Sequence, residues 1–212
     1  MHEELNVLVA KAKQLEGEML AEIREGRQKF GYEMEGRVIR FDAAVSAEHR
    51  KMAKSVARYL LEAKWLNIIT APMIWFCILP ILFMDVVAEA YQFVCFPIYG
   101  IPKVRRRDYV VMDRGRLLYL NSMERFNCVY CGYVNGVLAY VQEIAGRTEQ
   151  HWCPIKHAVS LKTRHSRYQH FLDYGDADQY AKRLEEVRHD FADLKRAEKC
   201  DALLPRPQIE KS

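Results

Sequence analysis

The sequence contains none of the short motifs that mark the best-known enzyme classes. It has no glycine-rich phosphate loop, no G-x-S-x-G elbow, no H-E-x-x-H helix and no internal repeat. It also lacks a strong charge of one sign, because the net charge is only +4 although 28% of the residues are charged. The basic residues gather around one apolar stretch, which favours a membrane flank over a nucleic-acid surface.

A secreted disulfide framework is absent as well. The six cysteines are irregularly spaced, and residues 1–30 are charged and helical in pattern, unlike a signal peptide. We therefore expect reduced thiols in the cytosol. A chain of 212 residues is long enough for one domain of ordinary size and a membrane segment.

Two consecutive apolar stretches dominate the middle of the chain. Residues 65–84 carry no charge, which suffices for a helix of about 30 Å and predicts one full membrane span. Residues 85–102 are also apolar, but Asp85, Glu89 and Gln92 interrupt them, so we expect a second span or a re-entrant or interfacial helix. The alternative is a buried core hairpin of a soluble protein.

Basic residues stand on both sides of these stretches, at Arg50, Lys51, Lys54, Arg58 and Lys64 and again at Lys103, Arg105, Arg106 and Arg107. The positive-inside rule then places both flanks in the cytoplasm. A membrane hairpin meets this condition, with both termini cytoplasmic and the lipid bilayer as its partner. Asp85 is expected in water at the tip of the hairpin, and the position of Glu89 is left open.

The fold class predicted from the remaining pattern is mainly α. Amphipathic helices are expected at residues 5–23, from Ser46 into the first span, and from Asp176 onward. Their apolar faces can bind a protein partner or a second copy of the chain. A short strand is expected at residues 37–41 and a β-hairpin at residues 108–121. The predicted divisions are 1–64, amphipathic helices; 65–102, membrane hairpin; 103–175, cytoplasmic metal-binding domain; and 176–212, C-terminal helix and tail.

Residues 126–158 contain C-x2-C-G followed by C-x3-H, which is typical of a metal site. A turn at Cys128 and Cys131 would present two sulfurs on one side, and Cys153 and His157 would lie one helical turn apart. Four such ligands predict a closed structural zinc site, because a catalytic zinc usually keeps one position for water. Iron, or an iron–sulfur cluster, is the alternative.

Membrane-anchored iron–sulfur proteins of the CDGSH type resemble the chain in their C-x3-H element, but their first pair is C-x-C. Beside the ligands stand Glu143, Arg147 and Glu149, which are the candidate catalytic residues. Glu143 and Arg147 are four residues apart on a predicted helix, so a solvated surface ion pair is the simpler interpretation.

The segments FPIYGIPKVRRRDY, NCVYCGYVNG and EIAGRTEQHWCPIKH resemble a family of bacterial membrane proteins usually described only as hypothetical. The resemblance covers roughly residues 37–185. It implies a bacterial inner-membrane location and a shared C-x2-C…C-x3-H site, but no activity.

These observations favour a membrane-anchored, zinc-stabilised interaction or accessory module at the cytoplasmic face. A metal-dependent membrane enzyme is the second hypothesis, based on the acids beside the metal site. An iron–sulfur redox protein is the third.

Overall fold

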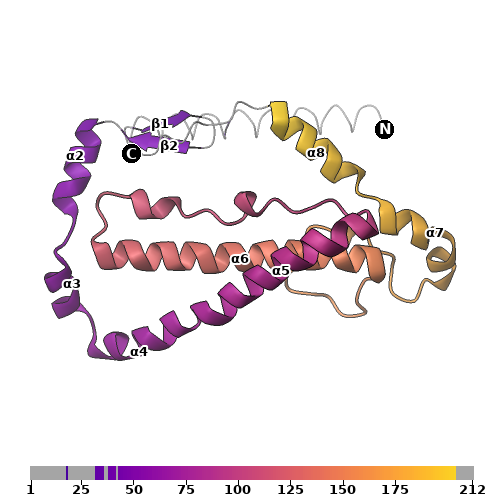
Figure 1. The fold of residues 1–212 in the computed structure, drawn as a ribbon, viewed down its shortest axis with the longest axis horizontal. Coiled ribbons are helices and arrows are strands. Elements are labelled where there is room, and N and C mark those ends of the chain that lie inside the picture. The colour runs from indigo at the N-terminus through magenta and orange to yellow at the C-terminus, as the bar shows by residue number, and fades with distance from the viewer. Residues whose placement is uncertain (1–17, 19–31, 36–37, 42, 204–212) are drawn as a thin grey trace. The chain divides into compact units, whose positions relative to one another are not determined.

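The computed structural model describes residues 18, 32–35, 38–41 and 43–203 (Figure 1). The chain forms two compact units, and the described parts of the first are β1 (Tyr32–Glu35), β2 (Val38–Phe41) and α2 (Ala43–Met52). β1 and β2 pair antiparallel, and β2 confirms the strand predicted at residues 37–41. The helix predicted at residues 5–23 and most of the predicted tail lie outside the described residues.

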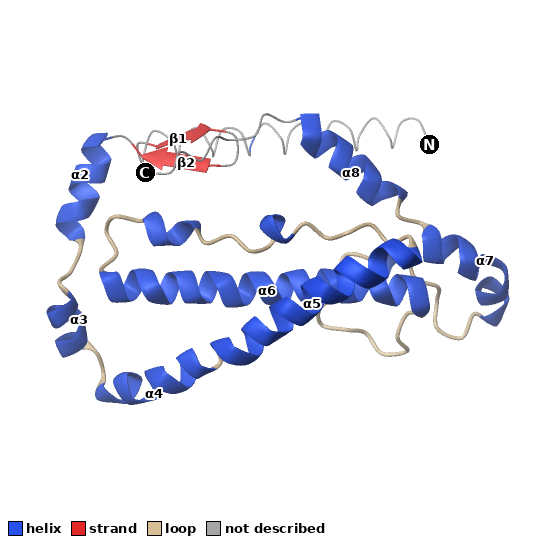
Figure 2. Cartoon of the chain, in the orientation of Figure 1, coloured by secondary structure: helices blue, strands red, loops and turns tan. Residues whose placement is uncertain are grey.

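The second unit, residues 54–203, is mainly helical (Figure 2), as predicted. Its α-helices are α3 (Val56–Glu62), α4 (Trp65–Phe76), α5 (Ile78–Tyr99), α6 (Ser122–Trp152), α7 (Ala177–His189) and α8 (Ala192–Leu203). Short 3-10 helices are η1 (Arg106–Asp108), η2 (Asp113–Arg116) and η3 (Tyr168–His170).

The helix expected to run from Ser46 into the apolar stretch is interrupted. α2 ends at Met52, and α3 begins after Ser55, whose side chain accepts a hydrogen bond from the backbone N–H of Arg58. A serine cap satisfies a free donor of the first turn, so it favours a new helix start at this position. The expectation of one continuous helix is therefore wrong.

The apolar stretch forms two successive helices without a hairpin. α4 ends at Phe76 and α5 begins at Ile78. Pro80 explains the break, because a proline ring clashes with the carbonyl four residues earlier, here that of Phe76. α5 then continues through Asp85 to Tyr99, so the predicted hairpin tip at Asp85 is wrong.

The described residues contain one apolar helical stretch long enough to cross a membrane, Trp65–Tyr99. Its most apolar window has a mean hydropathy of 2.1, and no residue of that window is buried in the protein.

α5 and α6 cross while running in the same chain direction (Figure 1). Three contacts with α6 fix this direction: one from Trp75 of the preceding α4 to Asn127, and two from α5, Gln92 to Tyr140 and Tyr99 to Trp152. Between the two helices, residues 101–121 return along α6. We call these residues the return segment.

The return segment packs on small residues of α6. The backbone carbonyl of Val111 lies against Gly132, and a Cβ atom added at Gly136 would lie only 2.8 Å from the carbonyl oxygen of Tyr109. The segment contains η1 and η2 instead of paired strands, so the β-hairpin predicted at residues 108–121 is wrong. The return segment is therefore held in place by packing against the α6 glycines and not by strand pairing.

α6 is longer than the helix predicted around Glu143 and Arg147. Asn121 caps it, since its side chain accepts from the backbone N–H groups of Met123 and Glu124, and the Glu124 carboxylate accepts from the Asn121 N–H. This capping box starts the helix before the first cysteine, so the predicted turn at Cys128 and Cys131 is wrong.

The last predicted helix is divided in two. Asp176 caps α7 as expected, accepting from the backbone N–H of Gln179 at 3.0 Å. The chain leaves helical conformation at Asp190 and resumes in α8. Val187 and Phe191, two members of the predicted apolar stripe, are buried at this junction.

Candidate functional site at the α5–α6 interface

α5 has its polar and apolar faces reversed relative to a helix of a water-soluble protein. Its inner face, packed against α6 and the return segment, consists of Asp85, Ala88, Gln92 and Phe96. Its outer face exposes Leu79, Phe83, Val86, Phe93, Val94 and Ile98. Phe83 is 72% exposed and Asp85 only 8%. A helix in water normally buries its apolar stripe, so the exposure of this apolar outer face requires an explanation.

Asp85 is the first polar anchor of the inner face. Arg106 holds it from two directions, with Nε 3.1 Å from Oδ1 and Nη2 2.7 Å from Oδ2. The hydroxyl of Tyr133 donates to the same carboxylate at 2.8 Å. A bidentate guanidinium and a phenol together satisfy a carboxylate that is removed from water. The side chain predicted at a wet hairpin tip therefore lies in the interior instead.

Gln92 is the second anchor, two turns further along α5. Its Oε1 accepts from the backbone N–H of Val104 at 2.9 Å, and its amide nitrogen donates to the Val104 carbonyl and to the Tyr140 hydroxyl. Tyr140 in turn donates to the carboxylate of Glu89. Burial, followed by the bond to Glu89, raises the pKa of Tyr140 well above its usual range, so the phenol stays protonated. This cluster ties the return segment to both helices.

Two of the three candidate catalytic residues form a buried ion pair on α6. Arg147 Nε lies 2.8 Å from Glu143 Oε1, and both side chains are less than 9% exposed. Ser166 donates to the other Glu143 oxygen at 2.6 Å, and Arg147 Nη1 donates to the carbonyl of Pro102 at 2.8 Å. The pairing follows the predicted four-residue spacing. Its predicted place on the solvated surface is wrong, because the pair is buried and is contacted by the return segment at Pro102 and by the loop after α6 at Ser166.

Glu149, the third candidate, faces a histidine. Its Oε2 lies 3.1 Å from Nε2 of His165, whose ring packs directly against Gly146. Glu149 is part of a contact that fixes the loop after α6.

A fourth polar cluster joins that loop to the end of the chain. Arg167 is 1% exposed, and its Nε donates to the Gln150 side chain at 2.6 Å. Its Nη2 donates to the carbonyl of Asp190 at 2.9 Å, and Nη1 pairs with Asp193. Although burial acts in the opposite direction, the Arg167 bond holds the pKa of Asp193 below its ordinary value. The cluster closes the α7–α8 junction over α6.

The four predicted metal ligands are spread along α6 and beyond it. Cys128 and Cys131 are neighbours on the helix, whereas Cys153 follows its last residue. With a rise of 1.5 Å per residue, Cys131 and Cys153 stand about 33 Å apart along the helix axis. His157 lies past Pro154, where the chain is extended and Ile155 bridges to Leu172, so no helical turn brings His157 beside Cys153.

One ion bound by all four side chains does not fit this fold, since the ligands of a tetrahedral zinc lie within about 2.3 Å of the metal. The same separation applies to an iron or an iron–sulfur cluster held by that set. Among the described residues, no other group of three or more His, Cys, Asp or Glu side chains has a metal-binding arrangement.

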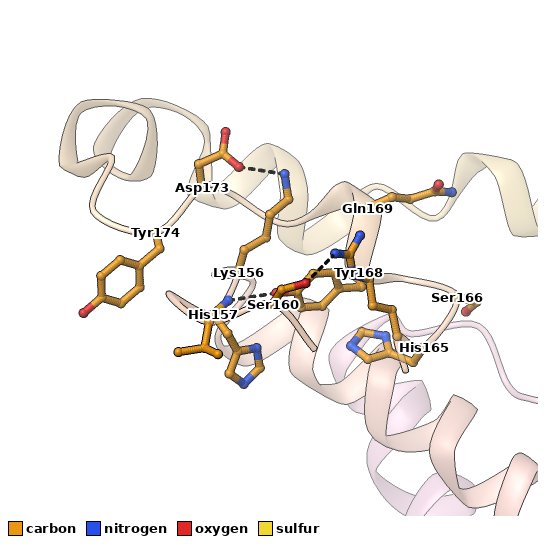
Figure 3. A pocket seen from close by; sticks show the side chains of 11 residues that line it. Lys156, His157, Ser160, His165, Ser166, Tyr168, Gln169, Asp173 and Tyr174 are labelled. Carbon is orange, nitrogen blue, oxygen red and sulfur yellow. Dashed lines mark hydrogen bonds and ion pairs between the residues drawn. The ribbon is translucent and has the colours of Figure 1, made fainter. Parts of the chain in front are cut away.

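The loop after α6 borders an open depression of about 790 Å³ (Figure 3). Its lining includes Lys156, His157, Arg164, His165 and Tyr168. Lys156 pairs with Asp173 at 2.7 Å and points away from His157, and the guanidinium of Arg164 lies over the Tyr168 ring. The cations do not converge on one point, so the depression has no focused anion site.

Sequence reasoning missed the anchors of the inner face. A usable signal was present, because Asp85, Glu89 and Gln92 recur at spacings of four and three and so share one face of a helix. By contrast, no local pattern points to Arg106 as the distant partner of Asp85.

Comparison with known proteins gives no further guidance. No protein-family model, no curated protein and no solved structure matches the chain. The resemblance to a bacterial membrane-protein family stays a prediction.

Proposed function

We propose that the protein is a membrane-anchored accessory module without a catalytic site of its own. α4 and α5 attach it to a bilayer, and α6 with its covering loops forms the part that a protein partner meets. The single observation that carries this proposal is the reversed polarity of α5. A bilayer explains it, because lipid chains accommodate Phe83 and Val94 whereas buried partners satisfy Asp85 and Gln92.

The basic flanks support the same assignment. The Lys103 ammonium lies 4.5 Å from the centre of the Phe93 ring, so a cation adjoins the outer face of α5. Lysine beside an exposed aromatic ring is the arrangement expected at the headgroup level, where the ammonium meets anionic lipids. We place the module at the cytoplasmic face of a bacterial inner membrane, in accord with the resemblance.

The alternative of a metal-dependent enzyme receives no specific support. Each carboxylate oxygen of Glu143 already has a partner, and Arg147 is bound to Glu143 and to backbone carbonyls. The contacts of Glu149 with His165 likewise hold the covering loop. These residues position the loops, and none of them faces the open depression as a free acid or base.

Charge placed on the outer face of α5 tests the proposal. We expect the double variant Phe83→Glu and Val94→Glu to be lost from the membrane fraction or degraded, because each buried charge costs about 2–3 kcal/mol in hydrocarbon. The measurement is the amount retained in membranes after an alkaline carbonate wash.

The matched control places the same charges on α6, as Asn135→Glu and Gln142→Glu, both exposed residues. We expect this control to be retained like the parent chain. Equal retention and stability of both double variants would contradict the proposal, since exposed apolar residues in water tolerate such changes.

A further inference from the structure

The depth at which the protein enters the bilayer follows from what lies beside α4 and α5. Trp75 stands ten residues after Trp65, which is about 15 Å along the helix and midway through residues 65–84. At this level α6 is in contact, because Trp75 Nε1 donates to Asn127 at 3.3 Å and the Tyr130 hydroxyl donates to the carbonyl of Ile74.

Exposed charges occupy the same level on the far side of α6. η2 packs on this part of α6, where Gly115 lies against Val129 and the stem of Arg125. Asp113, Arg114 and Arg116 in η2 are exposed, as is Arg125. These charges therefore lie beside the middle of the apolar stretch, only about one helix diameter, roughly 10 Å, beyond its contact with α6.

A fully spanning α4–α5 would carry these charges to the middle of the bilayer. Charged side chains at that depth are costly unless they are paired or reach water, and non-helical backbone such as the return segment is tolerated there only when protein or water covers it. The exposed η2 turn meets neither condition. A different orientation removes the conflict, because the apolar outer face of α5 points away from both α6 and the return segment that carries η2.

We propose that α4 and α5 lie within one leaflet, with the outer face toward the lipid chains and with α6 and the return segment in water on the side of both basic flanks. This inference rests on the proposed membrane attachment and specifies its partner surface as a single anionic leaflet. Trp65 and Tyr99, at the two ends of the stretch, then mark two points on one interface, where amphipathic rings are favoured. Both termini stay on one side without any hairpin tip.

Cysteine labelling tests the orientation in the full-length chain. Variants with a single cysteine carry it at Ala57→Cys, Arg107→Cys or Arg114→Cys, or keep native Cys77, all of them exposed positions. A membrane-impermeant maleimide is applied to inverted inner-membrane vesicles and to intact spheroplasts of a bacterial host. We expect the first three to be labelled in inverted vesicles and protected in spheroplasts.

The pair Arg114→Cys and Cys77 is the sharpest comparison, since both positions lie near the level of Trp75. We expect position 114 to be labelled in inverted vesicles, whereas Cys77 should be protected in both preparations. Labelling of positions 57 and 107 from opposite sides, or protection at position 114 in both preparations, would overturn the one-leaflet orientation while membrane attachment survives. Release of the chain by carbonate, or labelling of Cys77 in intact vesicles, would overturn attachment itself and the orientation with it.

Discussion

Buried polar side chains link segments of this molecule that are distant in the sequence. Asp85, Gln92, Glu143, Arg147 and Arg167 are all less than 9% exposed. Each has partners on a segment distant in the sequence, so each acts as a link between elements. Their removal is expected to be costly, because the partner left behind stays buried without a hydrogen bond.

The Glu143–Arg147 pair gives a direct test at this scale. Arg147→Met leaves the Glu143 carboxylate buried with only Ser166 as a partner, so we expect a loss of about 3–5 kcal/mol in the free energy of unfolding. The double variant Glu143→Leu and Arg147→Met should recover part of this loss. Denaturant unfolding in detergent measures both, and full stability of the single variant would show that the pair is solvated.

The predicted zinc ligands give a second test. If Cys128 helped to bind a structural ion, Cys128→Ser would impair folding. Because α6 separates Cys128 from Cys153, we expect the variant to unfold within about 0.5 kcal/mol of the parent chain, as for an ordinary partly exposed site. Val137→Ala, at a fully buried position of the same helix, serves as the destabilised reference. A loss in Cys128→Ser as large as in the reference would restore the metal hypothesis.

At the scale of elements, close packing between α6 and the return segment decides the arrangement. Gly132 and Gly136, four residues apart, form a flat strip on the helix against which backbone atoms of residues 109–111 lie. Glycine usually weakens a helix interior by up to about 1 kcal/mol relative to alanine. At these two positions the lower helix propensity is accompanied by close contact with the return segment.

Gly136→Ala tests this contact. The added methyl would lie 2.8 Å from the Tyr109 carbonyl oxygen and from the Val110 Cα, both backbone atoms that cannot rotate away. We expect a net loss of about 1–3 kcal/mol despite the better helix propensity of alanine. Asn135→Ala, at the exposed neighbouring position, is the control and should be neutral or slightly stabilising. Thermal unfolding of the two variants in detergent compares them, and a stabilised Gly136→Ala would contradict the packing.

For the second unit as a whole, the ends of α5, α6 and α7 meet around His151. Its ring stacks on Tyr99 at 5.2 Å and meets the His189 ring edge-on at 5.8 Å. Burial, followed by the charges of His189 and Arg188, lowers the pKa of His151 below its ordinary value of 6.5. The folded protein therefore binds this proton less readily than the unfolded chain does.

The consequence is a loss of stability on acidification. The His151 contribution is fully present above pH 6.5, falls as the pH drops below that value, and levels off once the folded group also titrates. We expect the melting temperature of His151→Phe, which keeps an aromatic ring, to decline less between pH 7.5 and pH 5 than that of the parent chain. His157→Phe, at an exposed position, is the control. Identical pH profiles for the parent and His151→Phe would contradict the assignment.

The sequence by itself determined the mainly helical class, the strand at residues 37–41, the apolar stretch from Trp65, the Asp176 cap and the four-residue pairing of Glu143 with Arg147. These features depend on local periodicity, capping and turn chemistry, which a few neighbouring residues decide. The tertiary structure alone decided that Asp85 is interior and pairs with the distant Arg106, that Arg167 is buried, and that the C-x2-C pair lies within a continuous helix. Those outcomes depend on which distant segments pack together, and the spacing of the C-x2-C and C-x3-H elements does not reveal that one rigid helix separates them.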